Sequence, residues 1–345
     1  MEGIYVVSNT AGFYWERVYA PAVAPTILAF GAAVDGVTDD SSCIQAALDV
    51  CGKAIIPWTA TGFVAGNITL GTRQEIFGTR KVQWKTPSGA YWAVRVRSHS
   101  IGGYAKIESV LFDLSACPTS VTAIRFGLLD GNVFGFRAHN VDFMHCGEAI
   151  GDEDTSSNYI VDVIFEDCLC YFTRGRQVRS RRSRGFITFR DFKIDHTYNS
   201  AQVTWGGALF TDVIGLELEK FDVVGPVQPA SVYQNDALGL GIYGTTNGRA
   251  SIWLTRVLID NTREPGLVID NVFNVFSDFL CIFQNLGQPL SISNSSDLKF
   301  ANTQIRGARG LTGAPDNNGI PIVNSARAQF TNTVSDYNLG HGVSL

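Results

Sequence analysis

A short unit recurs through the C-terminal two-thirds of the chain, and it constrains the possible folds more than any other feature of the sequence. Each copy is four residues long: the first residue is apolar, the third is usually polar, and the fourth is usually apolar. The first and last members of the copies are Phe143 and Cys146, Phe165 and Cys168, Phe189 and Phe192, Leu218 and Phe221, Leu254 and Val257, Phe279 and Ile282, Phe300 and Thr303, and Phe330 and Thr333, with Phe112 opening the series. By subtraction, successive first members from Phe143 on lie 22, 24, 29, 36, 25, 21 and 30 residues apart.

A period of this length is typical of a β-solenoid, in which each coil needs neighbours above and below to bury its apolar face. Two apolar residues three positions apart both point inward only if the chain bends between them. The bend positions are Asp167, Asp191, Asn302 and Asn332, and Asn and Asp tolerate a left-handed backbone. The repeat therefore predicts strand–bend–strand corners. The competing fold, an antiparallel β-sandwich, would need Asn-Gly or Asp-Gly hairpin turns, and the sequence has few of them.

If the predicted coils stack in register, residues that follow the first member of their copy by the same number of positions become neighbours in adjacent coils. Such neighbours lie about 4.8 Å apart. This places Cys146 beside Cys168 in the interior. It also places the acidic positions 152 and 154 beside the arginines at 174 and 176, so the basic run 174–184 is expected to pair with the acidic loop of the preceding coil. The alternative is a basic patch that grips an acidic polysaccharide or contacts another subunit.

The composition excludes several classes of function. The formal net charge is −5 and the pI is about 5.6, which argues against sequence-independent binding to nucleic acid because that binding needs a basic surface. No apolar run approaches the roughly 18 residues of a membrane helix, and the N-terminus lacks a basic start followed by an apolar core. We therefore expect no nucleic-acid partner, no membrane insertion, and synthesis in a cytosol.

The seven cysteines are an odd number, and only Cys168 and Cys170 lie very close to each other, as CxC rather than CxxC. We expect buried thiols rather than disulfides or zinc ligands, and we expect no metal site.

The segment "FGAAVDGVTDDSSCIQAALDV", residues 30–50, contains the adjacent acids Asp39 and Asp40 just before an apolar pattern at Ile44, Ala47 and Leu48. Such spacing predicts an amphipathic helix. Short acidic side chains at a helix start satisfy unpaired N–H groups and suit the positive end of the helix dipole. We therefore interpret the two acids as structural rather than catalytic.

The same segment resembles the entry motif of the pectate-lyase-like right-handed β-helix family, which includes many phage tailspikes. Residues 54–70 and 12–22 also resemble segments of such proteins, so the resemblance covers about the first quarter of the chain. It implies an all-β fold: a single-stranded right-handed parallel β-helix with an N-terminal capping α-helix. The expected divisions are an N-terminal extension for virion attachment or trimer contact (1–25), the capping helix with the first coils (26–105), and the β-helix body (106–345).

The resemblance also implies a setting: a homotrimer in a virion tail, joined to other tail proteins through its N-terminus and recognising a bacterial surface polysaccharide without a cofactor. The extra residues between the middle copies of the repeat predict loops at about 196–213 and 225–250, where binding residues concentrate. Their aromatic residues are candidates for stacking on sugars, as is a tryptophan expected to point outward from its strand. These substrate-binding candidates are Tyr198, Trp205, Tyr233, Tyr243 and Trp253.

Strand alternation predicts that Asp195, Asp222 and Asp260 point outward from neighbouring coils. One coil step combined with two residues along the strand gives about 8 Å between successive acids, a separation found in inverting glycoside hydrolases. Like-charge crowding would raise one pKa, as the acid role requires. These residues are the predicted catalytic acids, and an ordinary polar stripe on a solvated face is the competing interpretation.

A second outward pair, Glu217 and Glu219, supplies alternative acids, although Glu166 and Arg190 are expected to stack beneath Glu219 as a charge ladder. Lys193 and Arg190 are also candidates for binding substrate. With His196 they keep open a polysaccharide lyase, which needs a basic residue to abstract a proton and a cation to neutralise the uronate.

The sequence thus predicts a tailspike-like protein that binds and hydrolyses a bacterial surface polysaccharide such as O-antigen, capsule or exopolysaccharide. A non-catalytic receptor-binding protein with the same fold is the main alternative, because β-helices support many functions. Acids that share one groove with the aromatic residues would favour the enzyme, and acids neutralised by basic residues would favour the binding protein.

Overall fold

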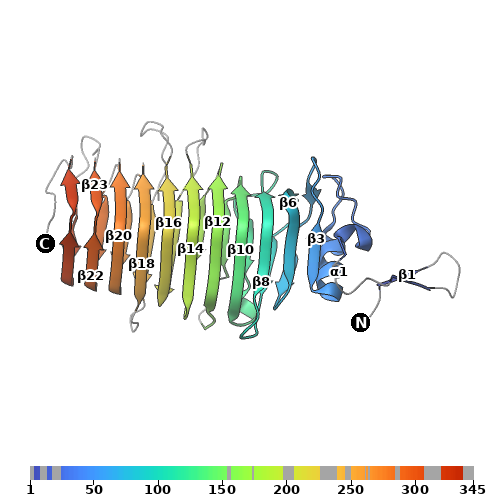
Figure 1. Cartoon of the computed structure of the whole chain (residues 1–345), viewed down its shortest axis with the longest axis horizontal. Helices are drawn as coiled ribbons and strands as arrows, with labels where there is room; N and C mark the ends of the chain where they lie inside the picture. Colours follow the sequence, from blue (N-terminus) through green and yellow to red (C-terminus); the bar gives the residue numbers. More distant parts are fainter. Residues whose placement is uncertain are drawn as a thin grey trace.

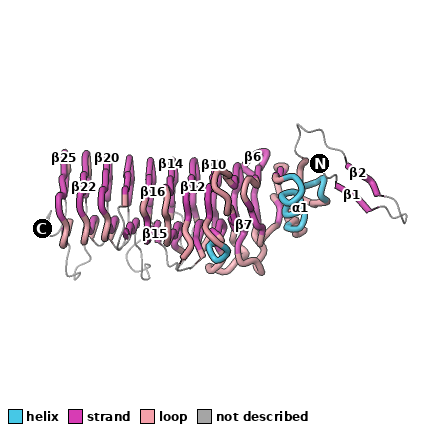
Figure 2. Tube along the Cα trace, turned by 90° about the horizontal axis from the view of Figure 1, so that it is seen from below, coloured by secondary structure: helices cyan, strands magenta, loops and turns pink. Residues whose placement is uncertain are grey.

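The computed structural model describes residues 25–153, 157–172, 175–196, 206–225, 239–244, 250–260, 262, 265–283, 288–306 and 320–336. It also describes the backbone of two short strands, β1 (Ile4–Val7) and β2 (Tyr14–Arg17), which pair antiparallel. The body is elongated, and two long parallel sheets run along it (Figures 1 and 2). The chain alternates between the two sheets, coil after coil, so the fold is the predicted right-handed parallel β-helix.

The long-strand sheet carries most of the chain's regular structure. In spatial order its path is β25 (Ala326–Thr331), β22 (Ser296–Ala301), β20 (Phe273–Phe283), β18 (Ser251–Asp260), β16 (Gly215–Val224), β14 (Phe186–Asp195), β12 (Ile160–Tyr171), β10 (Val133–Met144), β8 (Ala105–Asp113), β6 (Glu75–Lys85) and β3 (Lys53–Ile56). Beside this path lie β4 (Phe63–Val64), β23 (Gln304–Arg306) and β26 (Val334–Asp336).

The short-strand sheet closes the other side of each coil. Its order is β24 (Ile322–Val323), β21 (Leu290–Ser293), β19 (Leu267–Asp270), β17 (Leu240–Gly244), β15 (Gly206–Val213), β13 (Arg176–Ser180), β11 (Glu148–Asp152), β9 (Thr122–Phe126), β7 (Trp92–Arg97) and β5 (Ile68–Gly71). Adjacent strands within both sheets are parallel, so residues of successive coils form straight columns along the body.

A left-handed residue bends the long strands from β8 to β20 near their middle, as the repeat predicts, and equivalent residues separate β22 from β23 and β25 from β26. The bend column has φ values of 47° to 57° and consists of Ser109, Asn140, Asp167, Asp191, Lys220, Arg256, Phe279, Asn302 and Asn332. All four predicted bend residues lie in this column. Side-chain amides link some of its members, since Asn332 donates from Nδ2 to Asn302 Oδ1 at 3.2 Å and Asn140 donates to Ser109 Oγ at 3.1 Å. The corner is therefore a property of the stack as well as of single residues.

Most of the predicted first members align in one interior column, which contains Phe165, Phe189, Leu218, Leu254, Phe300 and Phe330. Their rings stack, with centroids 5.0 Å apart for Phe165 and Phe189 and for Phe300 and Phe330. Close packing of large aromatic side chains supplies the apolar burial that a coil cannot achieve alone.

Three of the predicted first members are wrong, and the first of them is Phe112, which pairs with Phe143 while Ile107 pairs with Ala138. Phe143 belongs to the second half of its strand, where it pairs with Cys170, and Ala138 takes the predicted place beside Phe165. His145 has a left-handed backbone, with φ 56°. This second bend lies between Phe143 and Cys146, so the pair matches the repeat although it is not at the corner of the long strand. As a result Cys146 does not lie beside Cys168, whose neighbour in the preceding coil is Val141.

The third wrong assignment is Phe279, which occupies the corner and is half exposed, while Ser277 fills the interior position beside Leu254.

The helix predicted from residues 39–52 is α1 (Ser41–Cys51), which ends at left-handed Gly52 and buries Ile44, Ala47 and Leu48. It lies at the N-terminal end of the stack (Figure 1) and contacts β3, β5 and the short helix η1 (Ile27–Phe30).

The acids before α1 are structural, but Asp40 does not cap the helix with its side chain. Its carboxylate accepts hydrogen bonds from the backbone N–H groups of Ala33, at 2.8 Å, and Val34, at 3.0 Å. Asp40 therefore fixes the loop that precedes the helix, while Asp39 accepts a hydrogen bond from Ser41 N at 2.9 Å.

All seven cysteines carry thiols rather than disulfides, but the prediction that they are buried holds only for Cys117, Cys146, Cys168 and Cys170, since Cys43 and Cys281 are partly exposed and Cys51 is exposed. Burial raises the pKa of the Cys168 thiol to about 12. Such a thiol is inert at neutral pH because the thiolate is the reactive form.

The basic run 174–184 pairs with acids on neighbouring coils. Arg179 lies 2.6 Å from Glu148, and the backbone N–H of Arg181 donates to Asp152. The predicted partners are wrong in register, because Ile150 pairs with Val178, an offset of 28 residues rather than 22. Residues 154 and 174 lie outside the described part of the chain.

Candidate functional site

The outer surface of the long-strand sheet is the candidate site, and it is built from columns of outward-pointing side chains. One column runs through β14 to β25 along the body. In coil order it contains Thr188, Glu217, Trp253, Phe276, Lys299 and Gln329. Strand alternation turns these side chains outward because the residues beside them, such as Leu254 and Phe300, are buried.

A hollow of about 450 Å³ lies on this surface, over the C-terminal coils. We call it the aromatic groove; its outward lining residues are Trp253, Thr255, Phe276, Asp278, Lys299, Gln329 and Thr331. The rings of Trp253 and Phe276 are nearly parallel, at 13°, with centroids 6.3 Å apart. Their exposed fractions are 37% and 41%, and Phe186, 44% exposed, packs on Trp253 from the other side. Exposed aromatic rings held in one row mark a binding surface rather than a core.

The polar residues at the two ends of this row differ in charge. At one end Lys299 Nζ lies 5.4 Å from the centroid of the Phe276 ring. At the other end Glu217 is next to Trp253 and accepts a hydrogen bond from Thr188 at 3.1 Å. Asp278 lies in the adjoining column and accepts a hydrogen bond from Asn302 Nδ2 at 2.8 Å.

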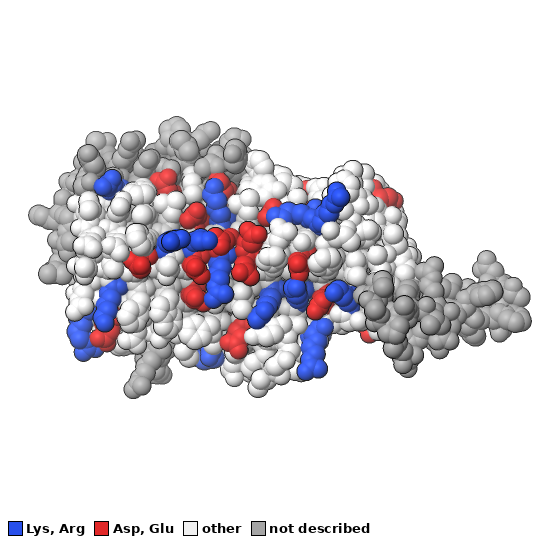
Figure 3. All heavy atoms as spheres, viewed as in Figure 1, with Lys and Arg blue, Asp and Glu red and all other residues white. Residues whose placement is uncertain are grey.

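The alternative acids Glu217 and Glu219 form the predicted charge ladder with Arg190. The guanidinium of Arg190 lies 3.2 Å from Glu217 and 3.4 Å from Glu219, and the register places Glu166 beside Arg190. On the face seen in Figure 3, acidic and basic side chains interleave over the middle coils. Arg190 thus pairs with both glutamates, and we interpret them as structural.

The predicted catalytic acids lie on the second half of the long strands, beyond the corner. Asp195 and Asp260 share a column, with Val224 between them, and Asp222 lies in the next column beside Lys193. This is the predicted stagger of one coil and two residues. Lys193 binds Asp195 at 2.7 Å, and Asp195 is only 8% exposed.

Asp222 has electrostatic surroundings that suit an acid catalyst. Burial raises the pKa of the Asp222 carboxyl above its ordinary value; Lys193 acts against this shift and Asp191 adds to it. A carboxylic acid that stays protonated nearer to neutral pH is a better proton donor.

The aromatic residues predicted to surround these acids are only partly brought together. Trp253 points outward as predicted, but its neighbours in the adjacent coils are Glu217 and Phe276 rather than the three aspartates. Tyr243 is half-buried in β17 on the short-strand sheet, where burial raises its pKa. The remaining candidates, Tyr198, Trp205 and Tyr233, lie outside the described residues.

The residues that would support a lyase are poorly placed for proton abstraction. His196 is fully buried, and this burial lowers its pKa to about 4 against a smaller effect of Asp195. Lys193 and Arg190 are engaged by carboxylates. A buried neutral imidazole is not an accessible base.

Phe186, Phe276, Asp278 and Lys299 are parts of the site that sequence reasoning missed. Trp253 and Phe276 are Cα partners in adjacent coils. The sequence prediction paired Leu254 with Phe279, and that register places Trp253 beside Asp278 instead. A count from the correct interior residue, Ser277, would have revealed the aromatic row.

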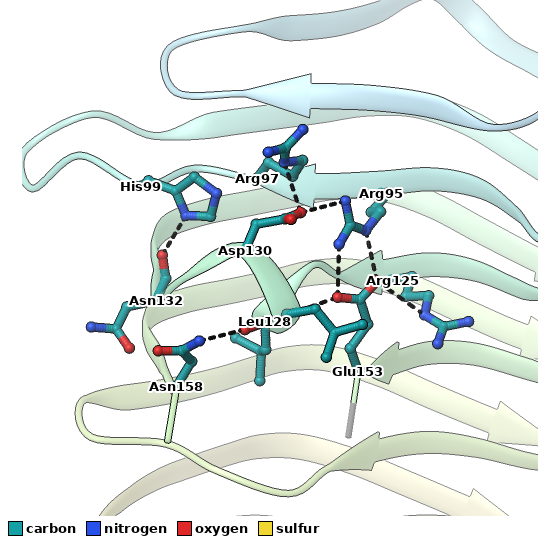
Figure 4. A network of polar contacts seen from close by, with 10 residues as sticks. Arg95, Arg97, His99, Arg125, Leu128, Asp130, Asn132, Glu153 and Asn158 are labelled. Carbon is teal, nitrogen blue, oxygen red and sulfur yellow. Dashed lines mark hydrogen bonds and ion pairs between the residues drawn. The ribbon is translucent and has the colours of Figure 1, made fainter. Parts of the chain in front are cut away.

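A second charged cluster lies on the short-strand sheet and is shown in Figure 4. Arg95 donates two hydrogen bonds to Glu153, at 2.7 and 2.8 Å, and lies 2.6 Å from Asp130, which Arg97 approaches to 3.0 Å. Glu153 also accepts from the backbone N–H of Leu129 at 2.9 Å, and Asp130 and Leu129 belong to η2 (Leu128–Asp130). Because these charges satisfy one another, the cluster is a brace for η2 rather than a binding site.

Within the described residues no group of three or more His, Cys, Asp or Glu side chains is arranged to hold a metal ion. No helix in the described part of the chain is long and apolar enough to cross a membrane.

The chain matches no protein-family model and no curated protein sequence. Solved structures do share its fold. The A-module of mannuronan C-5 epimerase AlgE4 from Azotobacter vinelandii aligns with a TM-score of 0.55 at 12% identity, over 92% of this chain and 99% of that one. The A-module of AlgE6 from the same organism aligns with a TM-score of 0.52 at 13% identity, over 92% and 97% of the two chains.

A phage protein is similar to the same degree. The enzymatically active domain of tailspike protein 2 from bacteriophage CBA120 aligns with a TM-score of 0.51 at 16% identity, over 95% of this chain and 45% of that one. At these identities the likeness establishes the β-helix fold and nothing more.

Proposed function

We propose that the protein binds a bacterial surface polysaccharide in the aromatic groove. The observation that carries this proposal is the nearly parallel pair of exposed rings, Trp253 and Phe276, on the floor of an outward hollow. Flat apolar rings match the apolar faces of sugar rings, and carboxylate and amide groups such as Asp278 and Gln329 can bind their hydroxyls. A rigid solenoid holds both kinds of group in fixed positions.

The setting that we propose is a phage tail, with the protein as a homotrimeric spike joined to other tail proteins through its N-terminal segment. Two findings support this setting: the resemblance of residues 30–50 to the entry motif found in tailspikes, and the shared fold with a phage tailspike domain.

The binding proposal is tested by removing one ring at a time. Trp253→Ala and Phe276→Ala should each weaken binding roughly tenfold, because each removes a stacking surface. The measurement is isothermal titration with surface polysaccharides purified from candidate host bacteria. Trp58→Ala is the matched control, since Trp58 is exposed but does not line the groove. Equal affinities for all four proteins would refute the proposed site.

Hydrolysis of the bound chain is the second function that we propose, and the raised pKa of Asp222 is the observation that favours it. Asp222 would protonate the leaving oxygen, and Asp195 or Asp260, one coil away in the adjoining column, would activate water. Binding without cleavage is the alternative, and the pairing of Asp195 with Lys193 favours it.

We expect Asp222→Asn to reduce release of new reducing ends at least about a hundredfold while leaving polysaccharide binding unchanged, because loss of a general acid costs that much. Asp278→Asn, which alters a carboxylate in the groove instead, should weaken binding more than it slows turnover. Appearance of the ultraviolet absorbance of an unsaturated uronate would indicate a lyase and contradict the hydrolytic assignment. A wild-type protein that binds but releases no ends would leave recognition as the function.

A further inference from the structure

Lys299 is a cation of the aromatic groove that no acid of the described chain neutralises. Two other basic side chains on the same sheet are held by acids: Arg190 by Glu217 at 3.2 Å, and Arg327 by both carboxylate oxygens of Asp297, at 2.5 and 2.6 Å. Lys299 contributes to the field that lowers the pKa of Asp297, after the larger effects of Arg327, but it forms no ion pair among the described residues. Its ammonium group lies instead near the Phe276 ring.

The row of side chains around Lys299 runs parallel to the solenoid axis. Trp253, Phe276 and Lys299 come from three successive coils and occupy one column. Coils are spaced by about 4.8 Å, which is close to the length of one sugar ring along a polysaccharide. Consecutive sugars of a chain that runs parallel to the solenoid axis would therefore meet Trp253, then Phe276, and then Lys299.

The charges along this row differ from end to end. Glu217 lies beyond Trp253, and Asp278 lies in the column next to Phe276. Arg190 pairs with Glu217, whereas Asp278 has no ion pair among the described residues. An anionic group placed near Asp278 would be repelled, whereas one placed at Lys299 would gain a charge-assisted hydrogen bond. Gln329, next in the column, can add an amide donor.

We infer that the groove selects an acidic polysaccharide, whose chain lies parallel to the solenoid axis with a carboxylate or other anionic substituent at Lys299. This inference rests on the proposed binding function. It adds the class of the ligand, its direction, and the residue that selects its charge.

The test compares an acidic polysaccharide with its own neutral form. Wild-type protein is first titrated with purified capsular and exopolysaccharides, both acidic and neutral, from candidate host bacteria. An acidic polysaccharide that binds is then reduced at its carboxyl groups and titrated again. We expect about tenfold weaker binding of the reduced form, and the same loss for Lys299→Met with the unreduced form, because each removes one charge-assisted contact.

Two further variants separate charge from packing. Lys299→Arg should retain most of the affinity for the acidic form, and Lys299→Met should bind the reduced form as well as wild type does. Lys85→Met is the matched control, because Lys85 lies on β6, away from the groove.

Three results would overturn the inference alone and leave the proposed function intact: preference for neutral polysaccharides, equal binding of the acidic and reduced forms, or no effect of Lys299→Met on the acidic form. Absence of binding to every polysaccharide, or binding that Trp253→Ala and Phe276→Ala leave unchanged, would overturn the proposed function and the inference with it.

Discussion

At the scale of single residues, a buried carboxyl group in the solenoid interior affects stability. Asp152 is 2% exposed and lies beside Phe126 in an interior column. Its Oδ2 accepts a hydrogen bond from Arg181 N, whereas its Oδ1 has no hydrogen-bond partner among the described residues. Burial raises the pKa of Asp152 to about 6, and the Arg181 backbone N–H and Arg179 only partly oppose this effect.

The raised pKa predicts how stability depends on pH. Because the pKa is higher in the folded state than the ordinary value of 3.8, ionisation of Asp152 destabilises the fold progressively between about pH 4 and pH 6. Asp152→Asn removes this cost. It should raise the free energy of unfolding at pH 7.5 by up to about 3 kcal/mol, from a pKa difference of about two units, and change it little near pH 3.5.

Urea unfolding of the two proteins at both pH values measures this difference. Asp49→Asn, at an exposed position on α1, is the control and should have little effect at either pH. A destabilised Asp152→Asn protein at pH 7.5 would show that the ionised carboxylate is stabilising, contrary to this account.

The strand–bend–strand corner is the element that organises both sheets and the site. At most corners a short polar residue adopts the left-handed conformation without strain. Phe279 does so with φ 57° and a half-exposed ring, which is costly for a bulky side chain.

Phe279→Asn should therefore raise the free energy of unfolding by about 1 kcal/mol, through relief of backbone strain. The measurement is thermal or urea unfolding. Phe273→Asn is the matched control: Phe273 is also exposed and on β20, but it is absent from the positive-φ residues. If both substitutions gave the same change, exposure of the ring rather than the corner would be responsible.

The corners also explain how far the sequence could predict the structure. At Asp167, Asp191 and Asn302 the bend residue is Asn or Asp, and the predicted interior residue before each of these bends is correct. At Phe279 the residue type gives no such signal, and the first member is misassigned there. A shift along a strand changes which outward residues share a column, so the aromatic row stayed hidden although the fold was predictable.

The predicted catalytic acids illustrate the same limit. Their stagger followed from alternation and coil counting, and the register agrees with it. The ion pair between Lys193 and Asp195, and the position of the acids beyond the corner from the groove, depend on side-chain packing and bend geometry. Neither can be derived from a pattern of apolar residues alone.

At the scale of the whole molecule, the solenoid converts a repeat in sequence into straight outward columns. Each coil contributes one side chain to each column, so a row of neighbouring outward groups arises from residues 23 or more positions apart, such as Trp253, Phe276 and Lys299. Elsewhere on the surface, charged side chains neutralise one another across coils, as Arg190 does with Glu217 and Arg95 with Glu153. The aromatic groove differs from these areas because its rings and its cation are left available for a ligand.

The most direct test of this account is oxidative footprinting of the protein with and without a bacterial surface polysaccharide that it binds, read by mass spectrometry. Bound polysaccharide should protect Trp253 and Phe276, while Trp58 and Tyr91, which are exposed outside the groove, should be oxidised equally in both samples. Protection of Trp58 or Tyr91 with no change at Trp253 and Phe276 would place the ligand elsewhere and contradict the central claim.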